Sequence, residues 1–149
     1  MKRSKKNEIR RELCWDLVEN GISYCFVKIV DVNKMIVDVI VNEFVYYDND
    51  CLVEYERNGP MVRFIINDLD EFEKKYIDKF LEKVRNKMSK TRYFRDAEIF
   101  EAKFKEYDGF EKFIMYVGDD ERIIVRGLLY LKIRLSKDVL DKIKLMLVK

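Results

Sequence analysis

The 149-residue chain contains no histidine. Without an imidazole, it cannot assemble a serine-histidine or cysteine-histidine catalytic relay or the common histidine-containing zinc sites. Its three cysteines, Cys14, Cys25 and Cys51, are widely spaced and set among apolar residues, which favours reduced, buried thiols over a disulfide framework. Hydrolysis through a protein nucleophile is therefore disfavoured, and any metal chemistry would need oxygen ligands.

Long hydrophobic runs are also missing. No apolar run approaches the ~20 residues that a membrane-spanning helix needs. Residues 1–6 are mostly basic and lead into a charged helical pattern instead of the apolar core of a signal peptide. Because 48% of the residues are hydrophobic and 39% are charged, we expect a compact cytoplasmic protein with a strongly ionised surface and no membrane partner.

The spacing of apolar residues predicts an α+β fold, with residues 1–149 forming a single domain. Helices are expected to flank a central mixed sheet, and the second half of the chain is expected to be antiparallel. A polar capping residue precedes each expected helix. These capping positions are Ser4 or Asn7, Asp68 and Ser136. The second helix has the clearest signal, because Asp68 and Glu71 form a capping box and an apolar face recurs to about Met88.

Segments rich in β-branched and aromatic residues predict the strands. Asp31-Val32-Asn33 joins the first two strands into a hairpin, and Asn58-Gly59-Pro60 and Asp108-Gly109 mark later turns. The expected strands cover residues 22–30, 34–46, 51–56, 61–66, 97–107, 112–117 and 122–135.

Asp38 interrupts an otherwise aliphatic run, residues 35–41, that is apolar on both faces and predicts a buried central strand. A buried carboxylate costs several kcal/mol unless it is paired or bound to a metal. Glu54 and Glu56 share one face of the next expected strand. If all three carboxylates converge, they would bind Mg²⁺ or Mn²⁺, which could activate a water molecule for phosphodiester hydrolysis.

With these residues, the order of expected elements over residues 4–90 resembles the core of the restriction-endonuclease-like PD-(D/E)XK nuclease family. Asp38 matches the aspartate of that family and Glu54 matches its first glutamate, whereas Glu56 stands where the family usually has lysine. The resemblance implies an endonuclease dependent on Mg²⁺ or Mn²⁺, with Asp38, Glu54 and Glu56 as its metal ligands and catalytic residues.

In that family a glutamate of the first helix sometimes assists catalysis, and Glu8 or Glu12 would take this place here. The alternative interpretation has no metal: hydrogen bonds hold Asp38, and the two glutamates of the next strand are solvated. A second motif of similar form, Glu101-Ala102-Lys103, is interpreted as solvent-facing, because alternation directs Phe100 and Phe104 toward the core.

Lysines and arginines gather in the first expected helix and after the second. The candidate nucleic-acid-binding residues are Lys5, Lys6, Arg10, Arg11, Arg85, Lys87, Lys90, Arg92, Tyr93 and Arg95. Such cations bind phosphates of DNA or RNA, and an exposed aromatic ring stacks on a base. The alternative is a basic helix end with Tyr93 and Phe94 packed inward. A formal net charge of +2 is also far below that of a DNA-coating protein.

Two functions remain open from the sequence. The first is a Mg²⁺-dependent nuclease or a nuclease-like protein that binds nucleic acid. The second is a non-catalytic interaction or regulatory protein, of the type that viruses and plasmids encode. In that case Trp15, otherwise expected in the core, or the aromatic strands would contact a protein partner or a second copy of the chain.

Overall fold

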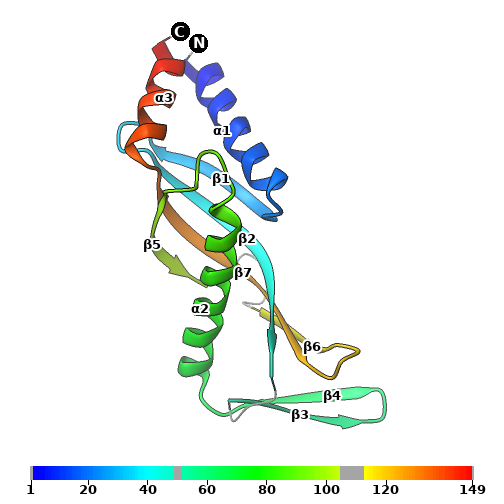
Figure 1. The fold of residues 1–149 in the computed structure, drawn as a ribbon. Helices are drawn as coiled ribbons and strands as arrows, with labels where there is room; N and C mark the ends of the chain where they lie inside the picture. Colours follow the sequence, from blue (N-terminus) through cyan, green and yellow to red (C-terminus); the bar gives the residue numbers. More distant parts are fainter. Residues whose placement is uncertain (1, 49–51, 105–112, 149) are drawn as a thin grey trace.

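The computed structural model describes residues 2–48, 52–104 and 113–148, and Cys51 and the expected turn at residues 108–109 lie outside them. The chain has the α+β fold expected from the sequence (Figure 1). In chain order its elements are α1 (Lys2–Glu19), β1 (Tyr24–Asp31), β2 (Ile36–Tyr47), β3 (Val53–Asn58), β4 (Met61–Ile66), α2 (Leu69–Met88), β5 (Glu98–Lys103), β6 (Phe113–Val117), β7 (Ile123–Arg134) and α3 (Lys137–Val148).

A five-stranded sheet forms the body of the molecule, with the order β1-β2-β7-β5 and with β6 also paired to β7. β2 and β7 pair along their full lengths, from Ile36 opposite Arg134 to Tyr47 opposite Ile123. All pairings in the described part of the chain are antiparallel, whereas a mixed sheet was expected. A parallel pair needs a long crossover connection, and here β1 and β2 join through a short turn.

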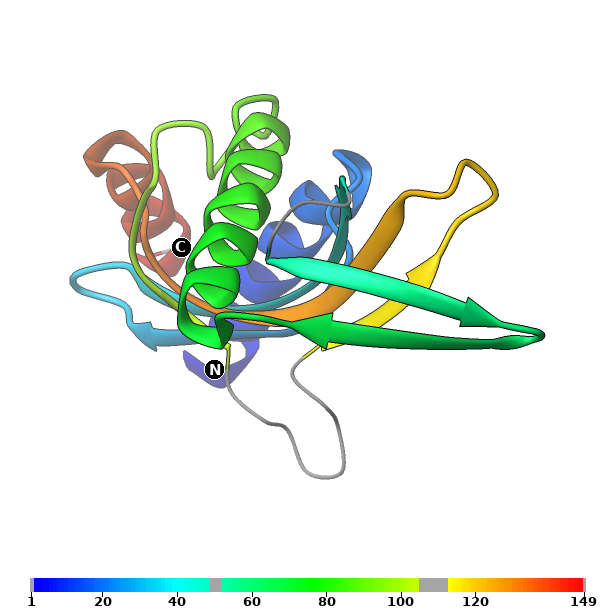
Figure 2. The same ribbon diagram turned by 90° about the horizontal axis from the view of Figure 1, so that it is seen from below.

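α2 lies across the concave face of the curved sheet (Figure 2). The inward-facing strand residues and the apolar faces of all three helices share one hydrophobic core. Leu13 of α1, Phe72 of α2 and Ile143 of α3 belong to it, with Val39 and Leu131 from the two central strands. Among the described residues, no helix combines the length and the apolar character that crossing a bilayer requires.

The outward-facing residues of β1, β2, β5, β6 and β7 form the opposite surface of the sheet, here called the open face. The register of the strands places Phe26, Ile114 and Tyr116 on this face, and their exposed fractions are 46%, 55% and 41%. Alternate residues of a strand point to opposite faces, so the same strands that fill the core also present large apolar side chains to solvent.

β3 and β4 form a separate two-stranded sheet, here called the arm, which projects beyond the body (Figures 1 and 2). Val53 at its base is fully buried, whereas Met61 near its tip is 73% exposed. The Tyr55 hydroxyl donates a hydrogen bond to Glu121 Oε2 at 2.5 Å. Because Glu121 lies between β6 and β7, this contact joins the arm to the body.

Several local signals in the sequence are confirmed. Asp68 caps α2, and its side chain accepts a hydrogen bond from the backbone N–H of Glu71. Gly21 follows α1 with a φ of 77°, the left-handed conformation expected for a residue that ends a helix. Asp31 Oδ1 accepts hydrogen bonds from the backbone N–H groups of Asn33 and Lys34, which closes the β1–β2 hairpin.

Other local expectations were wrong. α1 begins at Lys2, so Ser4 and Asn7 lie inside the helix instead of capping it. Trp15 is 62% exposed, because it lies on the side of α1 opposite the buried face of that helix. Cys25 is exposed where the pairing of β1 with β2 changes register, although Cys14 is buried as expected.

The register of β5 explains a further difference. β5 changes register on β7 between Ile99 and Glu101, so the intervening Phe100 is 40% exposed instead of packing in the core. Phe104 is buried as expected, and Glu101 and Lys103 pair with β7 residues of the open face. The motif at residues 101–103 is therefore outward-facing, as the sequence indicated.

Candidate functional site

The carboxylates predicted to bind a metal lie in two different sheets. Asp38 is near the start of β2, whose neighbours are β1 and β7, whereas Glu54 and Glu56 are exposed on β3 in the arm. From Asp38 to Tyr47, β2 covers about 30 Å at the rise of an extended strand before the chain turns toward the arm. No group of three metal-ligating side chains forms among the described residues.

The expected metal site at Asp38, Glu54 and Glu56 therefore does not assemble, and these residues do not fit Mg²⁺ or Mn²⁺ as a set. The physical reason is strand pairing: β3 pairs with β4, whereas the nuclease core would place it beside the strand that carries Asp38.

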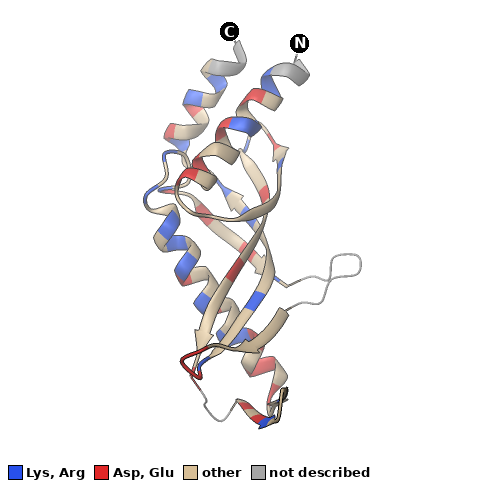
Figure 3. Cartoon of the chain, turned by 90° about the vertical axis from the view of Figure 1, so that its right-hand side faces the viewer, with Lys and Arg blue, Asp and Glu red and all other residues tan. Residues whose placement is uncertain are grey.

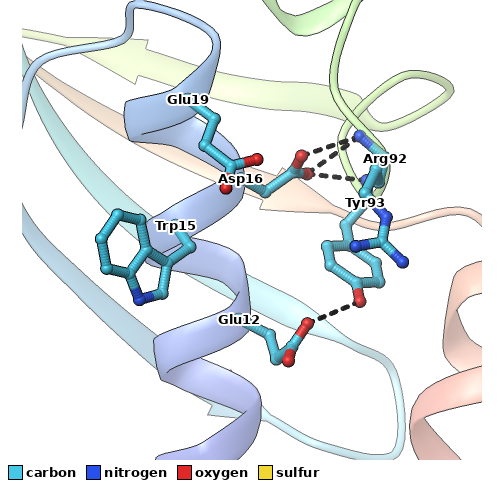
Figure 4. Close-up of a pocket in the computed structure, with 6 residues that line it drawn as sticks. All are labelled: Glu12, Trp15, Asp16, Glu19, Arg92 and Tyr93. Atoms are coloured by element: carbon cyan, nitrogen blue, oxygen red, sulfur yellow. Dashed lines mark hydrogen bonds between the residues drawn. The ribbon is translucent and has the colours of Figure 1, made fainter.

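Glu12 is also separated from Asp38. It accepts a hydrogen bond of 2.9 Å from the Tyr93 hydroxyl, in a hollow of about 340 Å³ between α1 and the segment after α2 (Figure 4). Burial, and then the hydrogen bond to Glu12, raise the pKa of the Tyr93 hydroxyl. Glu12 thus contacts a tyrosine of the fold, and the predicted catalytic role has no support in this geometry.

Asp16 lines the same hollow and was missed by the sequence analysis. It is 3% exposed, and its carboxylate accepts hydrogen bonds from the backbone N–H of Arg92 at 2.9 and 3.1 Å and of Tyr93 at 2.8 Å (Figure 4). Glu12 and Glu19 stand beside it. Three carboxylates around Arg92 and Tyr93 oppose the approach of a phosphate, so this hollow is a poor place for nucleic acid.

Lys87, another predicted phosphate contact, is engaged inside the fold. Its Nζ lies 2.6 Å from Glu43 Oε2 and 2.8 Å from the carbonyl oxygen of Gly21. Lys83 Nζ lies 3.2 Å from Glu43 Oε1. Burial by itself would raise the pKa of the Glu43 carboxyl, but the hydrogen bonds from Lys87 and Lys83 outweigh it and hold that pKa below its ordinary value.

Glu43 was not singled out from the sequence, although it carries the same signal as Asp38: one carboxylate within a strand that is otherwise mostly apolar. It is 7% exposed. What the strand pattern could not reveal is that both of its lysine partners come from α2, some forty residues further along the chain.

The lysines of α2 also contact the edge of β2 that faces away from β7. β2 continues past Val41, which pairs with the first residue of β1, Tyr24. Figure 3 shows Lys and Arg in a row along α2. Lys79 Nζ donates to the carbonyl oxygen of Tyr46 at 3.3 Å, and Lys83 Nζ donates to that of Phe44 at 2.7 Å. Exposed strand edges pair readily with other chains, and these two hydrogen bonds occupy backbone carbonyl oxygens that such pairing would use.

The cations of α1 lie in a different setting. Lys6 and Arg10 line a hollow of about 350 Å³ together with Lys28 of β1. The rest of the lining consists of Asn7, Phe26, Val27 and Ile29, so its described residues include three cations and no carboxylate. Of the other predicted phosphate contacts, Lys5 is half-buried and the remaining ones are exposed: Arg11, Arg85, Lys90 and Arg95.

Phe26 also borders a second hollow, of about 330 Å³, on the open face. Two rows of outward-facing side chains cross the strands here. In order across β1, β2, β7 and β5, one row is Phe26, Ile40, Tyr130 and Lys103, and the next is Lys28, Asp38, Lys132 and Glu101. The second row alternates in charge, and Lys132 Nζ lies 3.8 Å from Glu101 Oε2. The sequence pointed to Asp38 and, separately, to the motif of Glu101 and Lys103, but not to their meeting on one face of the sheet.

Comparison of the chain with protein-family models, with curated proteins and with solved structures gave no match. The two hollows that Phe26 borders, and the charges around them, are therefore the basis for inferring function.

Proposed function

We propose that this protein binds single-stranded nucleic acid, DNA or RNA, through the open face and does not cut it. The observation that carries the proposal is the hollow between α1 and β1, where Lys6, Arg10 and Lys28 meet and no carboxylate is among the described lining residues. Cations grouped in this way displace counterions from phosphates, which is the main source of affinity for nucleic acid.

Exposed aromatic rings support a single-stranded ligand over a duplex. Phe26 borders the cationic hollow, and Phe100 and Tyr116 extend the exposed aromatic surface across the sheet. The bases of a single strand can stack on such rings, with about 1–3 kcal/mol per base, whereas the bases of a duplex are already stacked on one another.

A metal-dependent nuclease has less support, because Asp38 lies on β2 whereas Glu54 and Glu56 lie in the arm. The basic residues at the end of α2 and after it also contribute less than expected, since Lys87 pairs with Glu43 and carboxylates surround Arg92. Lys6 and Arg10 of α1 remain the predicted phosphate contacts that best fit the proposal, because both line the cationic hollow.

The test measures binding of fluorescently labelled oligonucleotides of about eight nucleotides by anisotropy over a range of salt concentrations. For three phosphate contacts, the logarithm of the binding constant should fall with the logarithm of salt concentration with a slope of about −2. Lys28→Ala should make this slope shallower by about 0.7. Phe26→Ala should weaken binding by about 1–3 kcal/mol and leave the slope unchanged.

Two variants at exposed positions on the helices serve as controls: Lys75→Ala for the charge and Leu145→Ala for the apolar side chain. Neither should alter affinity or slope. Equal affinity for single strands and duplexes would contradict the proposed mode of binding, as would a salt slope that Lys28→Ala does not change.

The alternative is a protein-binding or self-associating module, and a specific observation favours it. Ile114, Tyr116 and Phe100 leave large apolar side chains exposed on the open face. Ile114 and Tyr116 are alternate residues of β6 and lie side by side on this face, and neighbouring exposed apolar side chains are typical of protein interfaces. Light scattering would then show a stable dimer or a complex whose affinity is insensitive to salt, and the oligonucleotides would not bind.

A further inference from the structure

Asp38 leaves a hydrogen-bonding requirement unmet within the chain. Its Oδ1 is buried and has no hydrogen-bond partner among the described residues. Lys28 and Lys132 are its neighbours on the adjacent strands, but Lys132 Nζ lies 3.8 Å from Glu101 Oε2. Buried polar atoms nearly always have a partner, so a carboxylate oxygen in this state calls for a donor from outside the chain.

The surroundings of Asp38 restrict what this donor can be. The neighbouring row places Ile40 between Phe26 and Tyr130, an apolar and aromatic strip about 7 Å away, which is the spacing of alternate residues in a strand. A flat ring lying on this strip would direct its edge at the carboxylate. Phe26 also borders the cationic hollow, so a phosphate attached to such a ring would meet Lys6, Arg10 and Lys28.

From this arrangement we infer that the hollow around Asp38 is a nucleobase subsite that selects guanine, an inference that rests on the proposed nucleic-acid binding. An ionised aspartate has two acceptor oxygens and no donor. Guanine presents two adjacent donors, N1–H and the 2-amino group, on its Watson–Crick edge. Adenine and cytosine present one donor beside an acceptor, and uracil presents one donor between two acceptors, so a carboxylate matches guanine best.

The first experiment needs no substitution in the protein. Labelled oligouridylates and oligothymidylates of about eight nucleotides, each with one central guanine, are compared with the same oligomers carrying hypoxanthine, which lacks the 2-amino group. The guanine oligomer should bind about tenfold more tightly, because one hydrogen bond to a charged acceptor is lost. The RNA and DNA series show which sugar the site accepts.

The second experiment replaces Asp38 by asparagine, which keeps the shape of the side chain but offers one acceptor and one donor. Asp38→Asn should abolish the difference between guanine and hypoxanthine and favour adenine, whose edge also pairs one donor with one acceptor. Asp141→Asn, at an exposed position on α3, is the matched control and should retain the preference of the native chain. A purely structural role of Asp38 would change stability but not base preference.

Equal binding of the guanine and hypoxanthine oligomers to the native protein would overturn the guanine subsite and leave the proposed nucleic-acid binding intact. Retention of the guanine preference in Asp38→Asn would also overturn it. If no oligonucleotide binds even at low salt, the proposed function fails and the subsite fails with it.

Discussion

At the scale of single residues, three carboxylates that are wholly or partly buried differ in what they contact. Asp16 accepts backbone hydrogen bonds from the segment after α2, and Glu43 pairs with two lysines of α2. Asp38 Oδ1 remains without a donor among the described residues. Burial is costly for all three, and among the described residues only the first two have partners that offset this cost, which is why Asp38 is the one assigned to a ligand.

The ion pairs of Glu43 with Lys83 and Lys87 predict how the stability of the fold depends on pH. Because the pKa of Glu43 is lowered in the folded state, the unfolded chain takes up this proton first as pH falls. The stabilisation is fully present above the ordinary glutamate pKa of about 4.3 and is lost as pH falls through the lower folded-state value. At pH 7, Glu43→Gln should lower the free energy of unfolding by roughly 1–3 kcal/mol.

Urea unfolding of the native chain and of Glu43→Gln between neutral and acidic pH would check this. The difference in the free energy of unfolding between the two proteins should become smaller as the pH is lowered. Glu54→Gln, at an exposed position in the arm, serves as the control and should follow the native chain throughout. A gap that is the same at every pH would contradict the assigned role of the Glu43 charge.

At the scale of elements, the arm stands apart from the five-stranded sheet and reaches the body through its buried base and through contacts nearer the surface. Outside its buried base, the Tyr55 hydroxyl contacts Glu121 Oε2, and Arg57 lies 3.9 Å from Glu121 Oε1. These groups are at or near the surface, where a hydrogen bond or ion pair contributes little. The arm is therefore expected to open locally without unfolding of the five-stranded sheet.

Removal of the hydroxyl in Tyr55→Phe tests this expectation. Amide hydrogen exchange in β3 and β4 should become several times faster, while exchange in β2 and β7 stays the same. Global stability should fall by less than about 1 kcal/mol. Tyr116→Phe, on the open face, is the matched control, and slower or unchanged exchange in the arm of Tyr55→Phe would show that Glu121 does not hold it.

At the scale of the whole molecule, the fold divides the charged residues among separate tasks. Lysines of α2 cover the edge of β2, carboxylates of α1 hold the segment after α2, and the cations of α1 join Lys28 beside the open face. A small net charge thus hides a local group of cations, because the carboxylates that balance it lie elsewhere in the chain, three of them around the Asp16 hollow.

The separation of the two sheets also predicts how the protein responds to divalent metals. A ligand that binds only the folded state raises the midpoint of thermal unfolding. Since Asp38 is not beside Glu54 and Glu56, millimolar Mg²⁺ or Mn²⁺ should leave this midpoint unchanged in differential scanning calorimetry, and labelled oligonucleotides should stay intact. A rise in the midpoint that disappears in the Glu54→Gln, Glu56→Gln double variant would contradict this expectation and support the metal site predicted from the sequence.

The elements themselves could be predicted because their signals are local. The Asp68 cap of the second helix, Gly21 after the first helix and the Asp31 turn each act through residues a few positions apart, and all three form as expected. The exposure of Trp15 and Phe100 was not predicted. Trp15 lies on the side of the first helix that faces away from the core, and Phe100 lies at a bulge that depends on the partner strand.

The sequence by itself thus determined the helices, the hairpins and the unusual presence of a carboxylate at position 38. Only the tertiary structure decided that β7 lies beside β2 and that β3 leaves the sheet, which separates Asp38 from Glu54 and places it beside Lys132 instead. Backbone preferences and caps act over one or two turns of chain, whereas the order of strands depends on how the whole chain buries its apolar faces together.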